Sequence, residues 1–111
     1  MRMTMLLQPV DRLDEAVDFY RDRLGLQERF RDGDRFAMLD TGSLPLALIA
    51  GDERLVEKPA LAFTVNDVDQ ALSELTRGGA RVLRTPENGP HERRAVLADP
   101  SGHPFVISSK T

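Results

Sequence analysis

Apolar residues in the first half of the chain recur with two different periods. Residues 3–10 are mostly apolar and predict a strand. The next apolar positions follow helical spacing and predict a helix over 14–25, with Gly25 as its C-terminal stop. Three more strand-like runs follow, separated by turn-forming residues, at 27–31, 35–40 and 44–50.

The same order of elements restarts after a polar connector at 51–59. A second amphipathic helix is predicted over 67–77, where Val68, Ala71, Leu72 and Leu75 are apolar and Gly78 follows. The predicted strands of this half are 60–65, 81–84, 94–98 and 104–108, and the loops between them are 85–90 and 99–102.

A weak internal duplication relates the two halves. A shift of 55 residues places Val10 over Val65, Asp14 over Asp69 and Ala16 over Ala71. We therefore predict one domain over residues 1–111, built from two similar modules at 1–52 and 59–111.

Composition narrows the classes of function. The 111 residues carry a net charge of -3, which argues against a nucleic-acid partner. The chain has no cysteine, so thiolate metal sites and cysteine nucleophiles are excluded. No apolar run approaches the roughly 18–20 residues that span a bilayer, and the N-terminus does not read as a signal peptide, so we expect a cytoplasmic protein.

Three sequence blocks, taken together, resemble the vicinal oxygen chelate superfamily. They stand in the right order and cover nearly the whole chain: Phe19-Tyr20-Arg21-Asp22-Arg23-Leu24-Gly25-Leu26, Phe63-Thr64-Val65-Asn66-Asp67-Val68-Asp69-Gln70-Ala71 and Asp99-Pro100-Ser101-Gly102-His103-Pro104-Phe105. This superfamily includes glyoxalase I, extradiol dioxygenases, fosfomycin-modifying enzymes and bleomycin-binding resistance proteins.

The resemblance implies an α+β fold of the glyoxalase/bleomycin-resistance/dihydroxybiphenyl-dioxygenase type. In that fold two βαβββ modules form curved mixed sheets, helices cover the convex faces, and the concave faces enclose a cavity. Chains of this length in the family are usually homodimers, so a homodimer is the implied assembly.

The resemblance also implies where a metal would be held. Family enzymes bind a divalent metal with His, Gln and Glu side chains, one from the first and one from the last strand of each module. Carried over to this chain, the positions are Met5, Ala60, Val106 and one of Leu46, Ala47 and Leu48, and all of them are apolar. We therefore expect no metal, no cofactor and no catalytic residue at this site.

Strand alternation predicts which side chains would line the cavity instead. If Met5, Ala60 and Val106 point inward, their alternate neighbours do too, whereas the residues between them point to the helices, namely Leu61, Phe63, Val65, Phe105 and Ile107. The predicted ligand-binding positions are Met5, Leu7, Phe36, Met38, Leu48, Ala60, Ala62, Thr64, His91, Val106 and Ser108. This lining suits an apolar or aromatic small molecule; in the alternative interpretation the same side chains close on each other as a core.

Several charged and titratable residues have simpler interpretations than a functional one. Arg93 and Arg94 could attract an anionic ligand, but a solvated strand edge is the simpler interpretation. His103 is typical of turn chemistry, and the acidic residues from Asp11 to Asp18 suit the start of a helix.

Three functional hypotheses remain open. The first is a metal-free small-molecule-binding protein with a sequestration or resistance role. The second is a metal-dependent lyase or dioxygenase with a relocated site, or acid-base catalysis by His91, and the third is an interaction module without a small ligand. Whether the chain is an enzyme stays open, although the apolar ligand positions favour a binding protein.

Overall fold

The computed structural model describes residues 1–110, and their contacts group them into two compact units. The first unit comprises residues 5–59, and the second comprises residues 1–4 together with 60–110. Neither helix of the described residues is long and apolar enough to span a lipid bilayer.

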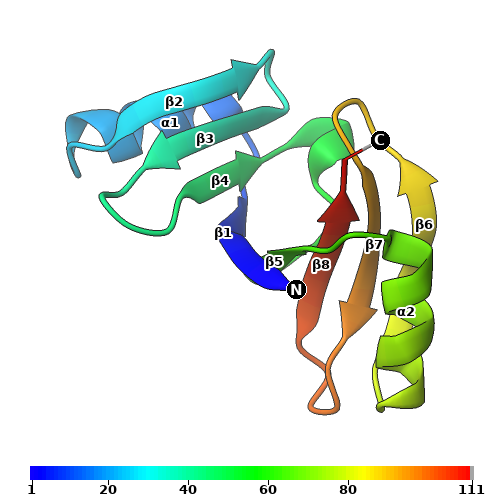
Figure 1. The fold of residues 1–111 in the computed structure, drawn as a ribbon. Helices are drawn as coiled ribbons and strands as arrows, with labels where there is room; N and C mark the ends of the chain where they lie inside the picture. Colours follow the sequence, from blue (N-terminus) through cyan, green and yellow to red (C-terminus); the bar gives the residue numbers. More distant parts are fainter. Residues whose placement is uncertain (111) are drawn as a thin grey trace. The chain divides into compact units, whose positions relative to one another are not determined.

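The first unit contains one helix on a four-stranded mixed sheet (Figure 1). Its sheet order is β2-β3-β4-β1, with β1 parallel to β4 and the other pairs antiparallel. The elements are β1 (Arg2–Pro9), α1 (Leu13–Asp22), β2 (Gln27–Asp32), β3 (Phe36–Asp40), β4 (Leu46–Ile49) and the short 3-10 helix η1 (Gly51–Glu53).

The second unit repeats this arrangement. Its sheet order is β6-β7-β8-β5, with β5 parallel to β8, and α2 packs against β6, β7 and β8 (Figure 1). The elements are β5 (Ala60–Thr64), α2 (Val68–Arg77), β6 (Arg81–Asn88), β7 (Arg93–Ala98) and β8 (Pro104–Ser109). The predicted α+β class with two βαβββ modules is confirmed.

Each unit has its own core between helix and sheet. Val17 of α1 is fully buried against Ala37, Leu39 and Leu48 in the first unit. In the second unit Val68 and Ala71 of α2 pack on Val65, Ala95, Leu97 and Ile107, with Phe63 and Phe105 at the margin. The predicted helix-facing positions Phe63, Val65, Phe105 and Ile107 are therefore confirmed. Leu61, which was predicted with them, is 42% exposed and lies outside this core.

Two element boundaries differ from the prediction by more than two residues. Helix α1 ends at Asp22, and Gly25 follows with φ +75°, where its N–H donates to the carbonyl of Arg21 at 3.1 Å. The predicted loop over 85–90 is wrong for its first four residues, since β6 continues to Asn88. Pro86 lies within β6, which tolerates it because β6 is an edge strand with register shifts on both sides of Arg84.

Candidate functional site

The strand registers identify equivalent positions in the two units. In the first unit Leu7 of β1 pairs with Ala47 of β4, and in the second Ala62 of β5 pairs with Val106 of β8. Leu7 and Ala62 are related by the shift that aligns the two halves of the sequence. Ala47, rather than Leu46 or Leu48, is therefore the counterpart of Val106.

The residues at the family's ligand positions do not fit a divalent metal. Met5, Ala47, Ala60 and Val106 offer no carboxylate or imidazole, whereas a divalent metal of this kind needs about three nitrogen or oxygen ligands. Within residues 1–110 no group of three or more His, Asp or Glu side chains is placed to hold a metal ion.

One face of the second unit's sheet points away from α2, and its residues form three rows across the strands. Paired residues of neighbouring strands point to the same face, so the registers define each row. From β5 through β8 and β7 to β6, two rows are Thr64–Ser108–Arg94–Glu87 and Ala62–Val106–Val96–Arg84. The third row, from β8 to β6, is Pro104–Ala98–Arg81.

The first of these rows, which we call the polar row, differs in chemistry from the others. Thr64 and Ser108 are half-buried, and the hydroxyl of Thr64 lies 3.1 Å from that of Thr4 in β1. Beside it the middle row presents Ala62, Val106 and Val96, which are buried. This face therefore combines hydroxyl groups, a cation and a strip of small apolar side chains.

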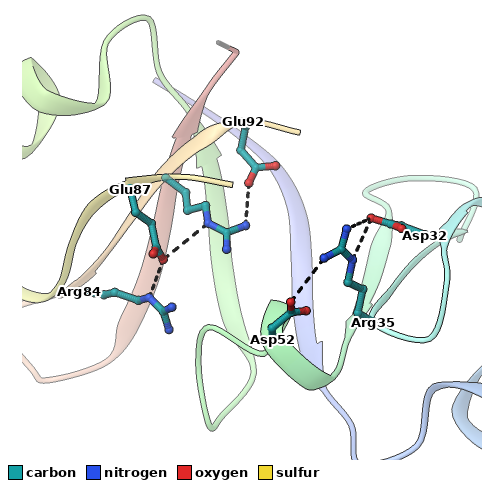
Figure 2. A network of polar contacts seen from close by, with 7 residues as sticks. Asp32, Arg35, Asp52, Arg84, Glu87 and Glu92 are labelled. Atoms are coloured by element: carbon teal, nitrogen blue, oxygen red, sulfur yellow. Dashed lines mark hydrogen bonds and ion pairs between the residues drawn. The ribbon is translucent and has the colours of Figure 1, made fainter. Parts of the chain in front are cut away.

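Arg94 is the charged centre of the polar row, and only 7% of its side chain is exposed. Its Nη1 donates to Glu92 Oε1 at 3.0 Å, and its Nε lies 3.7 Å from Glu87 Oε1. Glu87 in turn accepts a hydrogen bond from Arg84 Nε at 2.7 Å (Figure 2). Two carboxylates and the sheet thus fix the Arg94 guanidinium in place.

The interpretation of Arg93 and Arg94 as one solvated strand edge is wrong for Arg94. Arg93 points to the other face, where Nε and Nη2 donate to the Asp69 carboxylate of α2 at 2.8 and 3.0 Å. That pair holds the pKa of Asp69 below its usual range. Alternation along β7 puts Arg94 on the same face as Val96, and this is the signal that could have identified it.

The corresponding face of the first unit is largely apolar, with Asp32 and Asp40 towards its margins. Phe36 and Met38 of β3 lie on it because they pair with Ile49 and Ala47 of β4, and Leu7 shares it. The sequence interpretation missed Phe30 of β2, which pairs with Met38 and whose ring centroid lies 6.0 Å from that of Phe36.

One of the predicted lining residues lies elsewhere. Leu48 packs in the helix-side core with Val17 and Leu39, so its assignment to the cavity face is wrong. His91 is exposed in the connection between β6 and β7, where the sequence predicted a loop. The structure brings together Ala60, Ala62, Thr64, Val106 and Ser108 in the second unit, and Leu7, Phe36 and Met38 in the first.

A separate charged cluster lies near the end of the first unit's sheet. Arg35 Nη2 lies 3.0 Å from Asp32 Oδ2, and its Nη1 lies 3.4 Å from Asp52 Oδ2 (Figure 2). Hydrogen bonding to Asp32 raises the pKa of the Arg35 guanidinium. These contacts join β2, the turn before β3 and η1, and they have a structural role.

Comparison with known proteins agrees with the fold. An uncharacterized protein of Mycolicibacterium smegmatis is 37% identical over 106 residues, which cover 95% of this chain and 90% of the relative. An NAD-dependent benzaldehyde dehydrogenase structure from Legionella pneumophila superposes with a TM-score of 0.80 at 23% identity, covering 96% of this chain and 98% of the other. Methylmalonyl-CoA epimerase from Mycobacterium tuberculosis gives 0.70 at 24% identity, covering 99% and 88%.

At these identities the structural matches show the shared fold alone. The family model for the Glyoxalase/Bleomycin resistance protein/Dioxygenase superfamily matches residues 2–107, which is nearly the whole chain. The chain therefore belongs to the Glyoxalase/Bleomycin resistance protein/Dioxygenase superfamily.

Proposed function

We propose that this protein binds a small, largely apolar molecule without a metal, using the sheet faces that point away from its helices. The observation that carries the proposal is the set of apolar side chains at Met5, Ala47, Ala60 and Val106, where the family's enzymes hold their metal. Without ligating groups there, these faces offer packing area rather than Lewis-acid chemistry.

The chemistry of the two faces supports an apolar ligand. Phe30, Phe36 and Met38 present aromatic and thioether surface in the first unit, and 43% of Phe30 is exposed. Aromatic rings and methionine adapt well to planar or aliphatic ligands. In the second unit the half-buried Thr64 and Ser108 provide polar groups that orient a ligand at the edge of the apolar strip.

Metal content is the first test. Mass spectrometry of untagged protein, as isolated and after incubation with Mg, Mn, Fe, Ni and Zn ions, is expected to find much less than one metal per chain, and a chelator is expected to leave the melting temperature unchanged. One tightly held metal per chain or per dimer would contradict the proposal and direct the work to lyase and dioxygenase assays.

Ligand binding is the second arm of the same test. A thermal-shift screen of aromatic and alkyl compounds is expected to give stabilising hits. Ser108→Phe places a large side chain in the polar row and is expected to abolish the ligand-induced shifts in melting temperature. The matched substitution Leu61→Phe is expected to retain them, because Leu61 is 42% exposed on β5 and lies outside the rows of this face. The homodimer and the cytoplasmic location stay predictions, and sedimentation of the purified protein checks the first.

A further inference from the structure

The hairpin between β6 and β7 contains the one Asn-Gly pair of the sequence, Asn88-Gly89. An asparagine that precedes glycine is chemically labile, because glycine has no side chain to hinder attack of its backbone nitrogen on the neighbouring carboxamide. The other asparagine, Asn66, precedes Asp67, whose side chain hinders this attack. The lifetime of Asn88 therefore depends on how the fold holds it and Gly89.

The reaction open to this pair is a deamidation that consumes only water. The backbone nitrogen of Gly89 gives up its proton and bonds to Cγ of Asn88, the bond from Cγ to the side-chain nitrogen breaks, and ammonia leaves with that proton. Water then opens the five-membered imide. Cleavage between Cγ and the nitrogen gives Asp, and cleavage at the main-chain carbonyl gives isoaspartate, in which the chain runs through the side chain.

The main chain of the hairpin opposes the first step. Asn88 is the last residue of β6 and pairs with Arg93 of β7. In an extended strand the next nitrogen points away from the side chain, so Asn88 has to rotate about its Cα–C bond before the ring can close. The N–H of Gly89 also donates to the carbonyl of Glu92 at 2.6 Å, and this bond holds the attacking nitrogen in the turn.

The side chain of Asn88 is held by a second element. Nη1 of Arg93 donates to Oδ1 of Asn88 at 3.1 Å, while Nε and Nη2 of the same guanidinium donate to the Asp69 carboxylate of α2 at 2.8 and 3.0 Å. A guanidinium anchored on Asp69 by two bonds gives the carboxamide of Asn88 a fixed orientation. Asn88 is exposed, so water reaches the carboxamide when this contact opens.

We propose that Asn88 is a site of spontaneous deamidation, and that the Asp69–Arg93 pair slows the reaction in the folded chain by fixing its carboxamide. Arg93 contacts the reacting group, and Asp69 is a positioning residue that acts through Arg93. The reaction proceeds from a locally opened hairpin, so its rate follows the fraction of chains in which these bonds are broken. This modification is independent of the proposed binding of an apolar molecule.

Both products change the hairpin. A carboxylate replaces a neutral amide, which takes the formal net charge from -3 to -4 and places a second carboxylate beside Arg93 in addition to Asp69. Isoaspartate also lengthens the main chain next to Gly89, which lies closely against the guanidinium of Arg94. We expect the Asp product to keep the stability of the folded chain and the isoaspartate product to lose part of it.

Peptide mapping by mass spectrometry tests the site on the full chain. The protein is incubated at mildly alkaline pH in heavy-oxygen water, which labels a carboxylate formed during the incubation, both folded and unfolded in guanidinium chloride. We expect Asn88 to convert faster than Asn66 in the unfolded chain. Folding is expected to slow the conversion of Asn88 at least about tenfold, because the reactive state is then a minor one.

Variants test the role of the ion pair. Arg93→Met and Asp69→Asn are each expected to accelerate the conversion in the folded chain about threefold or more and to leave the unfolded rate unchanged, since a hydrogen bond to a charged group contributes at least that factor to opening. Arg77→Met is the matched control, because its Nε bonds to the Ser73 carbonyl of its own helix. Val17→Ala weakens the core of the first unit away from the hairpin. Both controls are expected to keep the wild-type rate, and circular dichroism confirms that each variant is folded.

Four results would contradict the proposal. Equal rates for Asn66 and Asn88 in the unfolded chain would show that the site is wrong. A folded rate that Arg93→Met leaves unchanged would show that the pair does not protect Asn88, and a slower one would mean that the guanidinium activates the carboxamide. An effect of Val17→Ala as large as that of Arg93→Met would mean that conversion follows general unfolding. A wild-type rate in Asp69→Asn would remove the positioning role of Asp69.

Discussion

Gly89 lies closely against the guanidinium of Arg94. A Cβ atom added to Gly89 would lie 2.6 Å from Cζ of Arg94, closer than real Cβ atoms approach other heavy atoms. The guanidinium cannot move aside freely, because it is buried and hydrogen-bonded to Glu92. A glycine at this position therefore permits the close approach of backbone and cation.

We expect Gly89→Ala to destabilise the protein by about 1–3 kcal/mol, the range for overpacking in a well-packed site. Urea denaturation measures the change in the free energy of unfolding. In an Arg94→Ala background the clash is absent, so the same substitution is expected to cost little. An equal loss in both backgrounds would show that Gly89 matters for its backbone alone.

The sequence predicted correctly which sheet face a side chain occupies where apolar and polar residues alternate along a strand, and it failed where they do not alternate. Thr64, Val106 and Ser108 lie in alternating strands, and their face followed from the pattern. Leu48 stands in a continuous apolar run, which contains no alternation to assign its face. Arg94 follows a second arginine, and only the pairing of β7 with β8 shows that the two point to opposite faces.

The two helices begin at equivalent positions of the repeat, yet only one start is capped by a side chain. Asp67 at the N-terminus of α2 accepts a hydrogen bond on Oδ1 from the N–H of Gln70 at 3.1 Å. Arg12 stands at the same point of α1 and makes no such cap. Helix α1 therefore depends more on the burial of Leu13 and Val17.

We expect Asp67→Ala to lower stability by about 1 kcal/mol, the usual cost of losing an N-cap. Arg12→Ala is the matched control from the other repeat and is expected to stay within about 0.5 kcal/mol, because its ion pair with Glu15 is exposed. Thermal or urea unfolding measures both variants. Similar losses for the two would mean that the cap of α2 contributes nothing measurable.

Element prediction from sequence was most accurate for periodic segments. The spacing of apolar residues and the glycines that follow predicted both helices to within a few residues, because an amphipathic stripe and a C-terminal stop are local signals. The predicted counterpart of β6 ended at Arg84, two residues before Pro86, because proline usually breaks a strand and the sequence alone does not show which strand is an edge.

At the scale of the whole molecule, the duplicated units share a framework and differ in surface chemistry. Parallel pairs β1–β4 and β5–β8 have equivalent registers. The faces built on them carry Phe36 in one unit and Arg94 in the other. A duplicated fold can in this way present an apolar surface on one unit and a charged surface on the other. The internal sequence repeat did not show which of the two units carries the charged side chain.

Acid stability is a property of the whole molecule to which the carboxylates Asp40, Asp69 and Asp99 contribute. The pKa of Asp99 is held below its usual range by backbone N–H groups, first that of His103 and also that of Ser101. The pKa of Asp40 is lowered mainly by the N–H of Gly42, and that of Asp69 mainly by hydrogen bonding to Arg93.

Since each of these pKa values is lower in the folded chain than in the unfolded one, the unfolded state binds more protons on acidification. The stabilisation is complete above the unfolded pKa and is lost as the pH falls through the folded pKa. We expect the free energy of unfolding to fall between about pH 5 and pH 2. Urea denaturation across this range measures how steeply the free energy of unfolding depends on pH. Combining Asp69→Asn with Asp99→Asn is expected to make this dependence shallower. If the double substitution leaves it unchanged, the acid-sensitive contacts lie elsewhere in the chain.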